Sequence, residues 1–238
     1  MKRLEGTNIS KSFKNRLVVN KVTLEVNQGE IVGLLGPNGA GKTTTFLMML
    51  GVYKPETGNI LLNNMDITRQ PVYIRAREGI SFLPQEPSIF KGLTVQENIL
   101  AIMDMHPSRK SPHIDIILAE MGLTELKNRK AYVLSGGERR RLEIARSLVL
   151  SPDFLLLDEP FAGIDPIQIK ELQNLIISLK EKGLGVIITD HNVREILKIT
   201  DRSYIINRGE VIFQGDSNTL FTNQRVKDEY LGKEFRWN

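Results

Sequence analysis

The stretch Gly36-Pro-Asn-Gly-Ala-Gly41-Lys42-Thr43 decides the fold, because it matches the pattern G-x-x-x-x-G-K-[ST]. The segments on either side of this stretch are also those that such a loop requires. The continuous apolar run Ile31–Leu35 predicts a strand buried on both faces, and residues 44–50 predict a helix. Glycines in such a turn let successive backbone N–H groups point at one anion, and the helix N-terminus adds its dipole.

This loop predicts a binding site for the phosphates of ATP. Lys42 can reach the β and γ oxygens, and the Thr43 hydroxyl can bind Mg²⁺. A glycine-rich turn without a ligand would explain the glycines, but it leaves Lys42 and Thr43 unexplained. The ATP-binding residues predicted here are Gly36, Pro37, Asn38, Gly39, Ala40, Gly41, Lys42, Thr43 and Thr44.

A second segment, Phe154-Leu-Leu-Leu-Asp158-Glu159, predicts a buried strand that ends in two carboxylates. We expect Asp158 to hold Mg²⁺ through water, and Glu159 to act as the general base on the attacking water. Strand ends are often acidic, so this signal is weak alone. The phosphate loop makes it strong.

The segment Leu134-Ser-Gly-Gly-Glu138 opens an Arg-rich helix. Ser135 and Glu138 form a capping-box pattern, which accounts for two of these residues. Two consecutive glycines weaken a helix start unless something must approach the backbone closely. The segment therefore also predicts a second anion site at a helix N-terminus, and the two interpretations are compatible.

The order of apolar patterns predicts an α/β fold with a mostly parallel sheet, an N-terminal antiparallel β part and a helical insertion. We predict an ATP-binding core at 1–86 and 151–216, a helical subdomain at 87–150, and a short helical extension at 217–238. Strands are predicted at 22–26, 31–35, 154–157 and 186–189, with a hairpin turning at Arg208-Gly209 between 204–206 and 211–213. Helices are predicted at 44–50, 94–103, 115–121, 138–150, 166–182 and 193–199.

Composition excludes several classes of function. The 238 residues include 32 Lys and Arg against 28 Asp and Glu, and the net charge of +4 is too mild to argue for nucleic acid. The absence of Cys excludes disulfides and Cys-ligated zinc. The longest uncharged stretches, 31–41 and 43–53, fall well short of the roughly 18 residues that span a bilayer. The basic run Arg139-Arg140-Arg141 predicts a solvated helix face.

The order of these motifs, with Gln85 after the phosphate loop and Gly163-Ile164-Asp165 and His191 after Glu159, resembles the ATPase subunits of ATP-binding-cassette (ABC) transporters. The resemblance covers essentially the whole chain. It implies a P-loop NTPase core, ATP hydrolysis, and a head-to-tail homodimer that closes on two MgATP. Each ATP would lie between the phosphate loop of one chain and four residues of the other, Ser135, Gly136, Gly137 and Glu138.

The same resemblance implies roles for single residues. Gln85 would contact Mg²⁺ and the attacking water, His191 would hold the γ-phosphate, Asp165 would reach across the dimer, and Phe13 would stack on adenine. Each role has a structural alternative. Asp165 is also a helix N-cap before a proline, His191 could be structural, and Phe13 could pack in the core of the first hairpin.

Residues 83–90, 137–145, 190–195 and 230–235 resemble the lipopolysaccharide-export group of the family. This implies two transmembrane permease subunits of the LptF and LptG type with an LptC-like accessory. It also implies a cytoplasmic location on the inner membrane of a Gram-negative bacterium, with membrane contact only through these partners. Gln85 and the segment to about Leu93 would line a groove for a partner helix, with Phe90 as its anchor. Burial of Phe90 inside the helical insertion is the alternative.

Three other functions remain open at this point. The ATPase subunits of branched-chain amino acid importers share much of the pattern. Soluble ABC ATPases of ribosomes or DNA usually carry two cassettes or a long coiled coil, and this chain has one cassette and no sustained heptads. A nucleotide sensor without turnover conflicts with the presence of Glu159 and His191.

Overall fold

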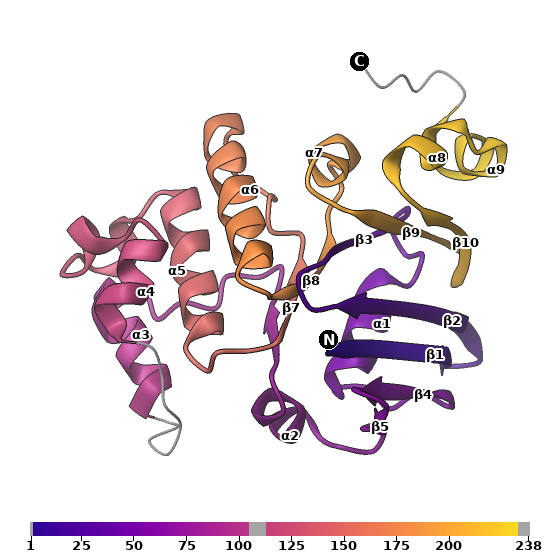
Figure 1. The fold of residues 1–238 in the computed structure, drawn as a ribbon, viewed down its shortest axis with the longest axis horizontal. Coiled ribbons are helices and arrows are strands. Elements are labelled where there is room, and N and C mark those ends of the chain that lie inside the picture. Colours follow the sequence, from indigo (N-terminus) through magenta and orange to yellow (C-terminus); the bar gives the residue numbers. More distant parts are fainter. Residues whose placement is uncertain (1, 105–112, 233–238) are drawn as a thin grey trace.

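Two β-sheets and a group of helices form the fold, which the computed structural model describes for residues 2–104 and 113–232 (Figure 1). One sheet consists of β1 (Arg3–Phe13), β2 (Arg16–Asn27), β4 (Thr57–Leu62) and β5 (Met65–Asp66), and its pairs are antiparallel. The other consists of β3 (Ile31–Leu35), β6 (Ile80–Leu83), β7 (Phe154–Asp158), β8 (Gly185–Thr189), β9 (Arg202–Asn207) and β10 (Glu210–Gly215).

The six strands of this larger sheet follow the order β10-β9-β3-β8-β7-β6. All neighbours are parallel except β9 and β10. That last pair is the predicted hairpin, and both Arg208 (φ 48°) and Gly209 (φ 84°) have the positive φ of a tight hairpin turn. The predicted α/β fold with a mostly parallel sheet and an N-terminal antiparallel part is confirmed.

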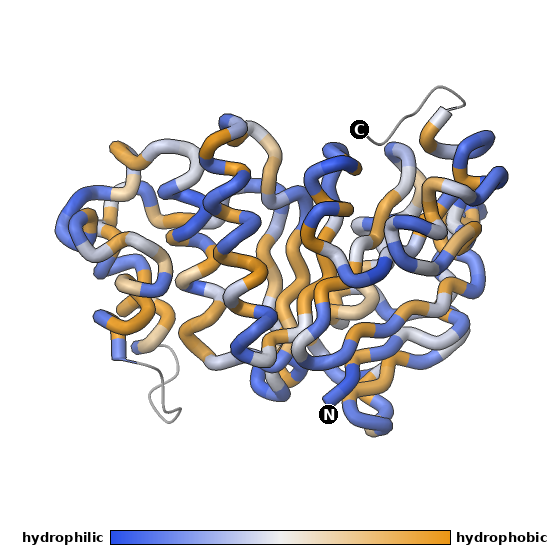
Figure 2. Tube along the Cα trace, turned by 45° about the horizontal axis from the view of Figure 1, so that its top comes forward, coloured by the Kyte–Doolittle hydropathy of each residue, from blue (hydrophilic) through white to orange (hydrophobic). Residues whose placement is uncertain are grey.

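All residues of β3, β7 and β8 are buried, as expected of parallel strands covered on both faces. Their side chains alternate between two hydrophobic clusters. Val32 and Leu156 belong to the cluster that contains Phe46, whereas Leu35 and Leu155 belong to the cluster of the helical insertion. Figure 2 shows these hydrophobic segments running through the middle of the molecule.

Nine α-helices lie in the described parts of the chain. They are α1 (Lys42–Leu50), α2 (Val72–Arg77), α3 (Val95–Asp104), α4 (Ile114–Glu120), α5 (Gly136–Leu148), α6 (Pro166–Glu181), α7 (Val193–Leu197), α8 (Ser217–Thr222) and α9 (Gln224–Val226). Helices α3, α4 and α5 lie together at one end of the molecule, beyond α6 (Figure 1). None of these helices is long and apolar enough to cross a membrane.

The structure corrects several predicted helix ends. Helix α5 begins at Gly136 rather than 138, because Ser135 is its N-cap, and it ends at Leu148 rather than 150. Helix α7 ends at Leu197 rather than 199. The tail beyond 217 is helical as predicted, through α8, α9 and a π-helical turn at Lys227–Leu231. Its last predicted part, 233–238, lies outside the described residues.

Helix α1, which carries Lys42, is anchored at its C-terminus by the buried guanidinium of Arg75. Arg75 Nη1 donates to the carbonyls of Met48 at 2.8 Å and Met49 at 2.7 Å. These carbonyls belong to the last turn, where cations are favourable. Burial lowers the pKa of Arg75 to about 10, so the side chain stays charged at neutral pH.

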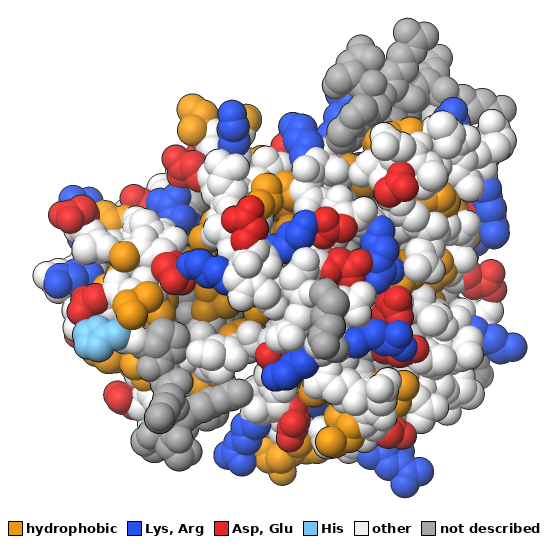
Figure 3. Space-filling view, in the orientation of Figure 1, with side chains coloured by type: hydrophobic (Ala, Val, Ile, Leu, Met, Phe, Trp, Pro, Cys, Tyr) orange, Lys and Arg blue, Asp and Glu red, His pale blue; other side chains and the backbone are white. Residues whose placement is uncertain are grey.

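The face in Figure 3 mixes basic and acidic side chains without one large patch of either sign.

Candidate active site

The phosphate loop runs between the end of β3 and the start of α1, as its sequence predicts. Gly36 has φ +153°, and a Cβ there would lie 2.0 Å from the carbonyl oxygen of Ile206. No residue with a side chain fits at this position. The loop is closed by a bond from the Ala40 N–H to the Pro37 carbonyl at 3.2 Å, and Gly209 N–H donates to Ala40 O at 3.0 Å. The backbone is therefore held in a fixed curve.

Lys42 lies inside this curve and is only 6% exposed. Its Nζ donates to the carbonyls of Gly36 at 2.8 Å and Pro37 at 3.1 Å. Burial lowers the pKa of Lys42, while the negative charges of Glu159 and Asp158 oppose that shift. A nearly buried ammonium bonded to neutral carbonyls is well placed for a stronger, charge-assisted bond to a phosphate.

Two carboxylates follow one another at the end of β7. Asp158 is 3% exposed, and the Thr189 hydroxyl donates to its Oδ1 at 2.6 Å. Glu159 adopts the left-handed conformation (φ 50°), which is strained for a residue with a side chain. Its N–H donates to Thr189 O at 3.0 Å, so β8 fixes this turn. Thr189 is a site residue that the motifs did not reveal.

The three residues predicted to be catalytic meet in the structure. Gln85 Nε2 donates to Glu159 Oε2 at 2.7 Å, and His191 Nε2 lies 2.6 Å from Glu159 Oε1. Each follows the carboxyl end of a strand, and the three strands β6, β7 and β8 are neighbours in the sheet. Ligands of open α/β sheets bind at this edge. A carboxylate held by two polar groups beside a phosphate loop can accept a proton from water.

These residues share one cavity of about 340 Å³. It is lined by Val18, Asn38, Gly39, Gly41, Lys42, Thr43, Thr44, Gln85, Glu159 and His191. All but Val18 were predicted from the sequence.

Phe13 is not among the described residues that line this cavity. Its ring is 38% exposed and packs edge-on against Tyr53 at 5.2 Å between centroids, so adenine stacking stays a prediction.

The residues predicted to hold Mg²⁺ have suitable chemistry. Thr43 and Gln85 line the cavity, and Asp158, the last residue of β7, directly precedes the lining residue Glu159. Mg²⁺ prefers oxygen ligands and is usually held by one or two protein groups together with substrate phosphates. These side chains therefore fit a magnesium ion that enters with ATP.

Ser135, Gly136 and Gly137, here called the signature edge, begin helix α5. The predicted capping box is confirmed, since Glu138 N–H donates to Ser135 Oγ at 3.3 Å and Ser135 N–H donates to Glu138 Oε2 at 2.7 Å. The signature edge does not line the described wall of the phosphate cavity in its own chain. Gly136 instead borders a separate cavity of about 110 Å³. The role of the edge in a second chain stays a prediction.

Asp165 is the N-cap of α6, and its Oδ1 accepts bonds from the N–H groups of Ile167 and Gln168, both at 3.1 Å. The structural alternative for Asp165 is therefore confirmed, and its role across a dimer stays a prediction.

Arg140 corrects the interpretation of the basic run as a solvated face, because it is only 6% exposed. Its guanidinium donates to the carbonyls of Pro84 at 3.1 Å, Glu159 at 2.9 Å and Pro160 at 3.1 Å, and to Glu143 Oε2 at 2.8 Å. One side chain thus ties α5 to the segments that carry Gln85 and Glu159. In the sequence, only the i,i+3 spacing of Arg140 and Glu143 could have indicated that Arg140 forms an ion pair within the helix.

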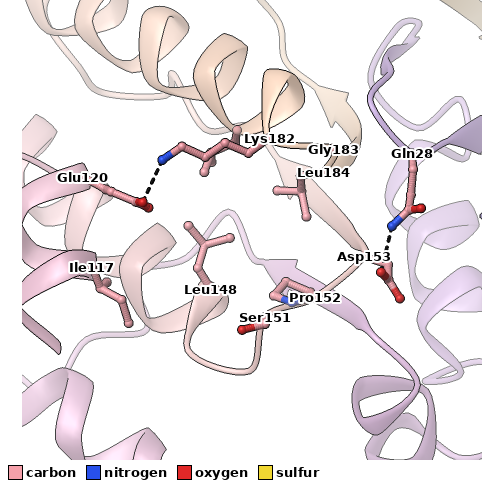
Figure 4. Close-up of a pocket in the computed structure, with 11 residues that line it drawn as sticks. Gln28, Ile117, Glu120, Leu148, Ser151, Pro152, Asp153, Lys182, Gly183 and Leu184 are labelled. Carbon is pink, nitrogen blue, oxygen red and sulfur yellow. Dashed lines mark hydrogen bonds and ion pairs between the residues drawn. The ribbon is translucent and has the colours of Figure 1, made fainter. Parts of the chain in front are cut away.

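A further cavity of about 320 Å³ lies between α4, α5 and the end of α6 (Figure 4). Leu148 and Leu184 form apolar parts of its wall, and Lys182 Nζ pairs with Glu120 Oε1 at 2.8 Å. None of the predicted site residues lines its described wall. The phosphate cavity is therefore the candidate active site.

Comparison with known proteins agrees with this site. Residues 19–162 match the family described as ABC transporter. An uncharacterised ABC transporter ATP-binding protein of Rhizobium meliloti is 50% identical over 98% of this chain and 89% of its own length. The lipopolysaccharide export system ATP-binding protein LptB of Acidithiobacillus ferridurans is 48% identical over 98% of both chains. LptB of Escherichia coli K12 is 46% identical over 99% of this chain and all of its own.

Solved structures of ATP-binding cassettes are also similar to this chain. The crystal structure of a nucleotide-free ATP-binding cassette from an ABC transporter has a TM-score of 0.88 at 29% identity, covering 98% of this chain and 100% of that one. The ADP conformation of an ATP-binding cassette has a TM-score of 0.86 at 30% identity with the same coverage. The chain belongs to the ABC transporter family, as an ATP-binding and ATP-hydrolysing subunit with the P-loop NTPase fold.

Proposed function

We propose that the chain powers the extraction of lipopolysaccharide from the inner membrane of a Gram-negative bacterium. The observation that carries the proposal is the 46–48% identity, over at least 98% of the chain, to proteins named for lipopolysaccharide export. The three residues predicted to be catalytic, Gln85, Glu159 and His191, line one cavity together with the phosphate loop, which supports the ATPase part of the proposal. The chain would act as a homodimer on the cytoplasmic face, beneath LptF-like and LptG-like permease subunits with an LptC-like accessory.

The chain's own residues account for ATP hydrolysis. The backbone N–H groups of the phosphate loop and Lys42 bind the β- and γ-phosphates. Glu159 accepts a proton from the water that attacks the γ-phosphorus, and the bond to the bridging β–γ oxygen breaks. His191 and Gln85 both contact the Glu159 carboxylate. When ATP is bound, His191 would hold the γ-phosphate and Gln85 would contact the attacking water. A magnesium ion held by Thr43, Asp158 and Gln85 would neutralise phosphate charge.

The proposal assigns the second half of each ATP site to the partner chain. The Ser135 hydroxyl and the backbone N–H groups of the signature edge would donate hydrogen bonds to the γ-phosphate. Glu138 and Asp165 would lie beside the γ-phosphate. This arrangement is supported by the position of the edge in a single chain, where it lies outside the phosphate cavity. Phe13 would stack on the adenine from the end of β1.

Replacing Lys42 with Ala is expected to weaken ATP binding by about 1.5–3 kcal/mol, because it removes a charge-assisted contact to phosphate. This corresponds to an affinity loss of roughly tenfold to 150-fold. Isothermal titration calorimetry with MgATP measures the change, and Lys170→Ala on the exposed side of α6 is the matched control. An affinity within twofold of the parent chain would contradict the assignment of Lys42.

Phe90 is the proposed anchor for a permease helix. The alternative of burial is wrong, because the ring is 47% exposed. It is held in place from two sides: the Phe90 N–H donates to Asn98 Oδ1 at 2.9 Å, and the Arg146 guanidinium lies 4.6 Å from the ring centroid. A fixed, half-exposed aromatic ring is typical of an interface hot spot.

Replacing Phe90 with Ala is expected to weaken assembly with the membrane subunits by about 2 kcal/mol or more, roughly 30-fold in affinity. Nucleotide binding stays unchanged, since Phe90 does not line the phosphate cavity among the described residues. Co-purification from detergent-solubilised membranes measures the effect. Ile116→Ala, at an exposed apolar residue of α4, is the control. Equal recovery of membrane subunits with both variants would exclude Phe90 as the anchor.

The experiment that tests the proposed function is purification of the tagged chain from solubilised membranes, followed by mass spectrometry of its companions. We expect permeases of the lipopolysaccharide-export type. Permeases for branched-chain amino acids would instead establish the importer alternative, and ribosomal proteins in place of permeases would overturn the assignment to a transporter.

A further inference from the structure

The second glycine of the signature edge already has a hydrogen-bond acceptor within its own chain. Gly137 N–H donates to Gln168 Oε1 at 2.6 Å. Gln168 lies in the first turn of α6, where its own N–H is held by Asp165. A Cβ on Gly137 would lie 2.3 Å from that same oxygen. The missing side chain of Gly137 is therefore what lets the carboxamide reach the start of α5.

This bond competes with the role that the proposed function gives to the signature edge. A backbone N–H carries a single hydrogen, and that of Gly137 is directed at Gln168 Oε1. A phosphate oxygen of ATP would need the same hydrogen. Phosphate is the stronger acceptor because its bond is charge-assisted, so it can replace a neutral carboxamide when ATP is present.

We propose that Gln168 acts as a placeholder acceptor on Gly137 in the nucleotide-free chain and is displaced by the γ-phosphate when the dimer closes. Gln168 then sets how much ATP is needed for closure. This inference rests on the proposed function, since it assumes that the signature edge meets ATP bound by the partner chain. It extends that function by adding a residue that opposes closure.

The alternative is that Gln168 only fastens α5 to α6 and keeps the signature edge in position. The two roles predict changes of opposite sign. Removing a placeholder frees an N–H for phosphate and favours closure, whereas removing a fastener displaces the edge and hinders it.

The test uses a Glu159→Gln background, in which ATP is bound without turnover, and measures dimer formation by light scattering across an ATP titration. Replacing Gln168 with Met keeps the length of the side chain but removes the carbonyl acceptor. We expect the ATP concentration for half-maximal dimerisation to fall about twofold to tenfold, the range of one ordinary hydrogen bond. Replacing Gln168 with Glu should raise it, because a carboxylate binds the N–H more tightly and repels phosphate.

Asn174→Met is the matched control, since Asn174 is an exposed carboxamide on the same helix and its replacement should leave the titration unchanged. Hydrogen exchange of the Gly137 amide without nucleotide gives an independent measurement. It should be faster in the Gln168→Met chain than in the control. Thermal melting identifies any variant that is misfolded.

Weaker or unchanged dimerisation of the Gln168→Met chain, with the parent still closing on ATP, would overturn the placeholder role alone. A parent Glu159→Gln chain that remains monomeric at saturating ATP would instead overturn the proposed function, and the inference would fall with it. The two failures are therefore distinguishable in the same titration.

Discussion

Replacing Glu159 with Gln is expected to lower the rate of ATP hydrolysis by about 10²–10⁴-fold while leaving ATP affinity nearly unchanged. The amide has the shape of the carboxylate but cannot take a proton from the attacking water. ATP affinity depends mainly on the phosphate loop and Lys42, whose bonds to the phosphates remain available in the Glu159→Gln chain. Steady-state hydrolysis and calorimetry with MgATP measure the two quantities separately.

The same substitution should leave a stable dimer with ATP bound, because closure no longer leads to hydrolysis. Light scattering should show twice the monomer mass with ATP and the monomer mass without it. Glu210→Gln, at an exposed carboxylate of β10, is the control and should hydrolyse ATP at the parent rate. A normal hydrolysis rate in the Glu159→Gln chain would show that another group is the general base.

Replacing Arg140 with Met is expected to destabilise the fold by about 3–5 kcal/mol, the usual cost of removing one partner from a buried ion pair. The change leaves the Glu143 carboxylate, itself only 3% exposed, without its ion-pair partner. It also removes the donor from the carbonyls of Pro84, Glu159 and Pro160. Chemical denaturation measures the free energy of unfolding.

A second substitution tests whether the buried charge causes this loss. The double variant Arg140→Met with Glu143→Leu should be more stable than Arg140→Met alone, because no unpaired charge remains in the core. Breaking the exposed pair of Arg225 and Glu229 by Arg225→Met should cost less than about 1 kcal/mol. A loss that small for Arg140→Met would contradict the structural role assigned to Arg140.

The sequence predicted the phosphate site well because its determinants are local. The loop from Gly36 to Thr43 closes on itself within a few residues, and the buried strands on either side are continuous apolar runs. The carboxyl ends of parallel strands meet at one edge, so the strand pattern placed Glu159 beside the phosphate loop, whereas Gln85 and His191 were expected there only from the resemblance to the ABC family.

The contacts of Arg140 and Gln168 could not be predicted in this way. Arg140 bonds to residues 56 and 20 positions away, and Gln168 bonds to Gly137 across 31 positions. Such pairs depend on how α5 packs against its neighbours, which no short motif encodes. A run of three arginines usually marks a solvated face, and one buried member looks the same in sequence as an exposed one.

The central claim is that each ATP lies between the phosphate loop of one chain and the signature edge of another. A crystal structure of the Glu159→Gln chain with MgATP tests it directly. The account predicts Ser135 Oγ and Gly137 N of one chain at about 3 Å from the γ-phosphate held by the partner's loop. ATP contacted by a single chain, with the same protein monomeric in saturating ATP, would contradict it.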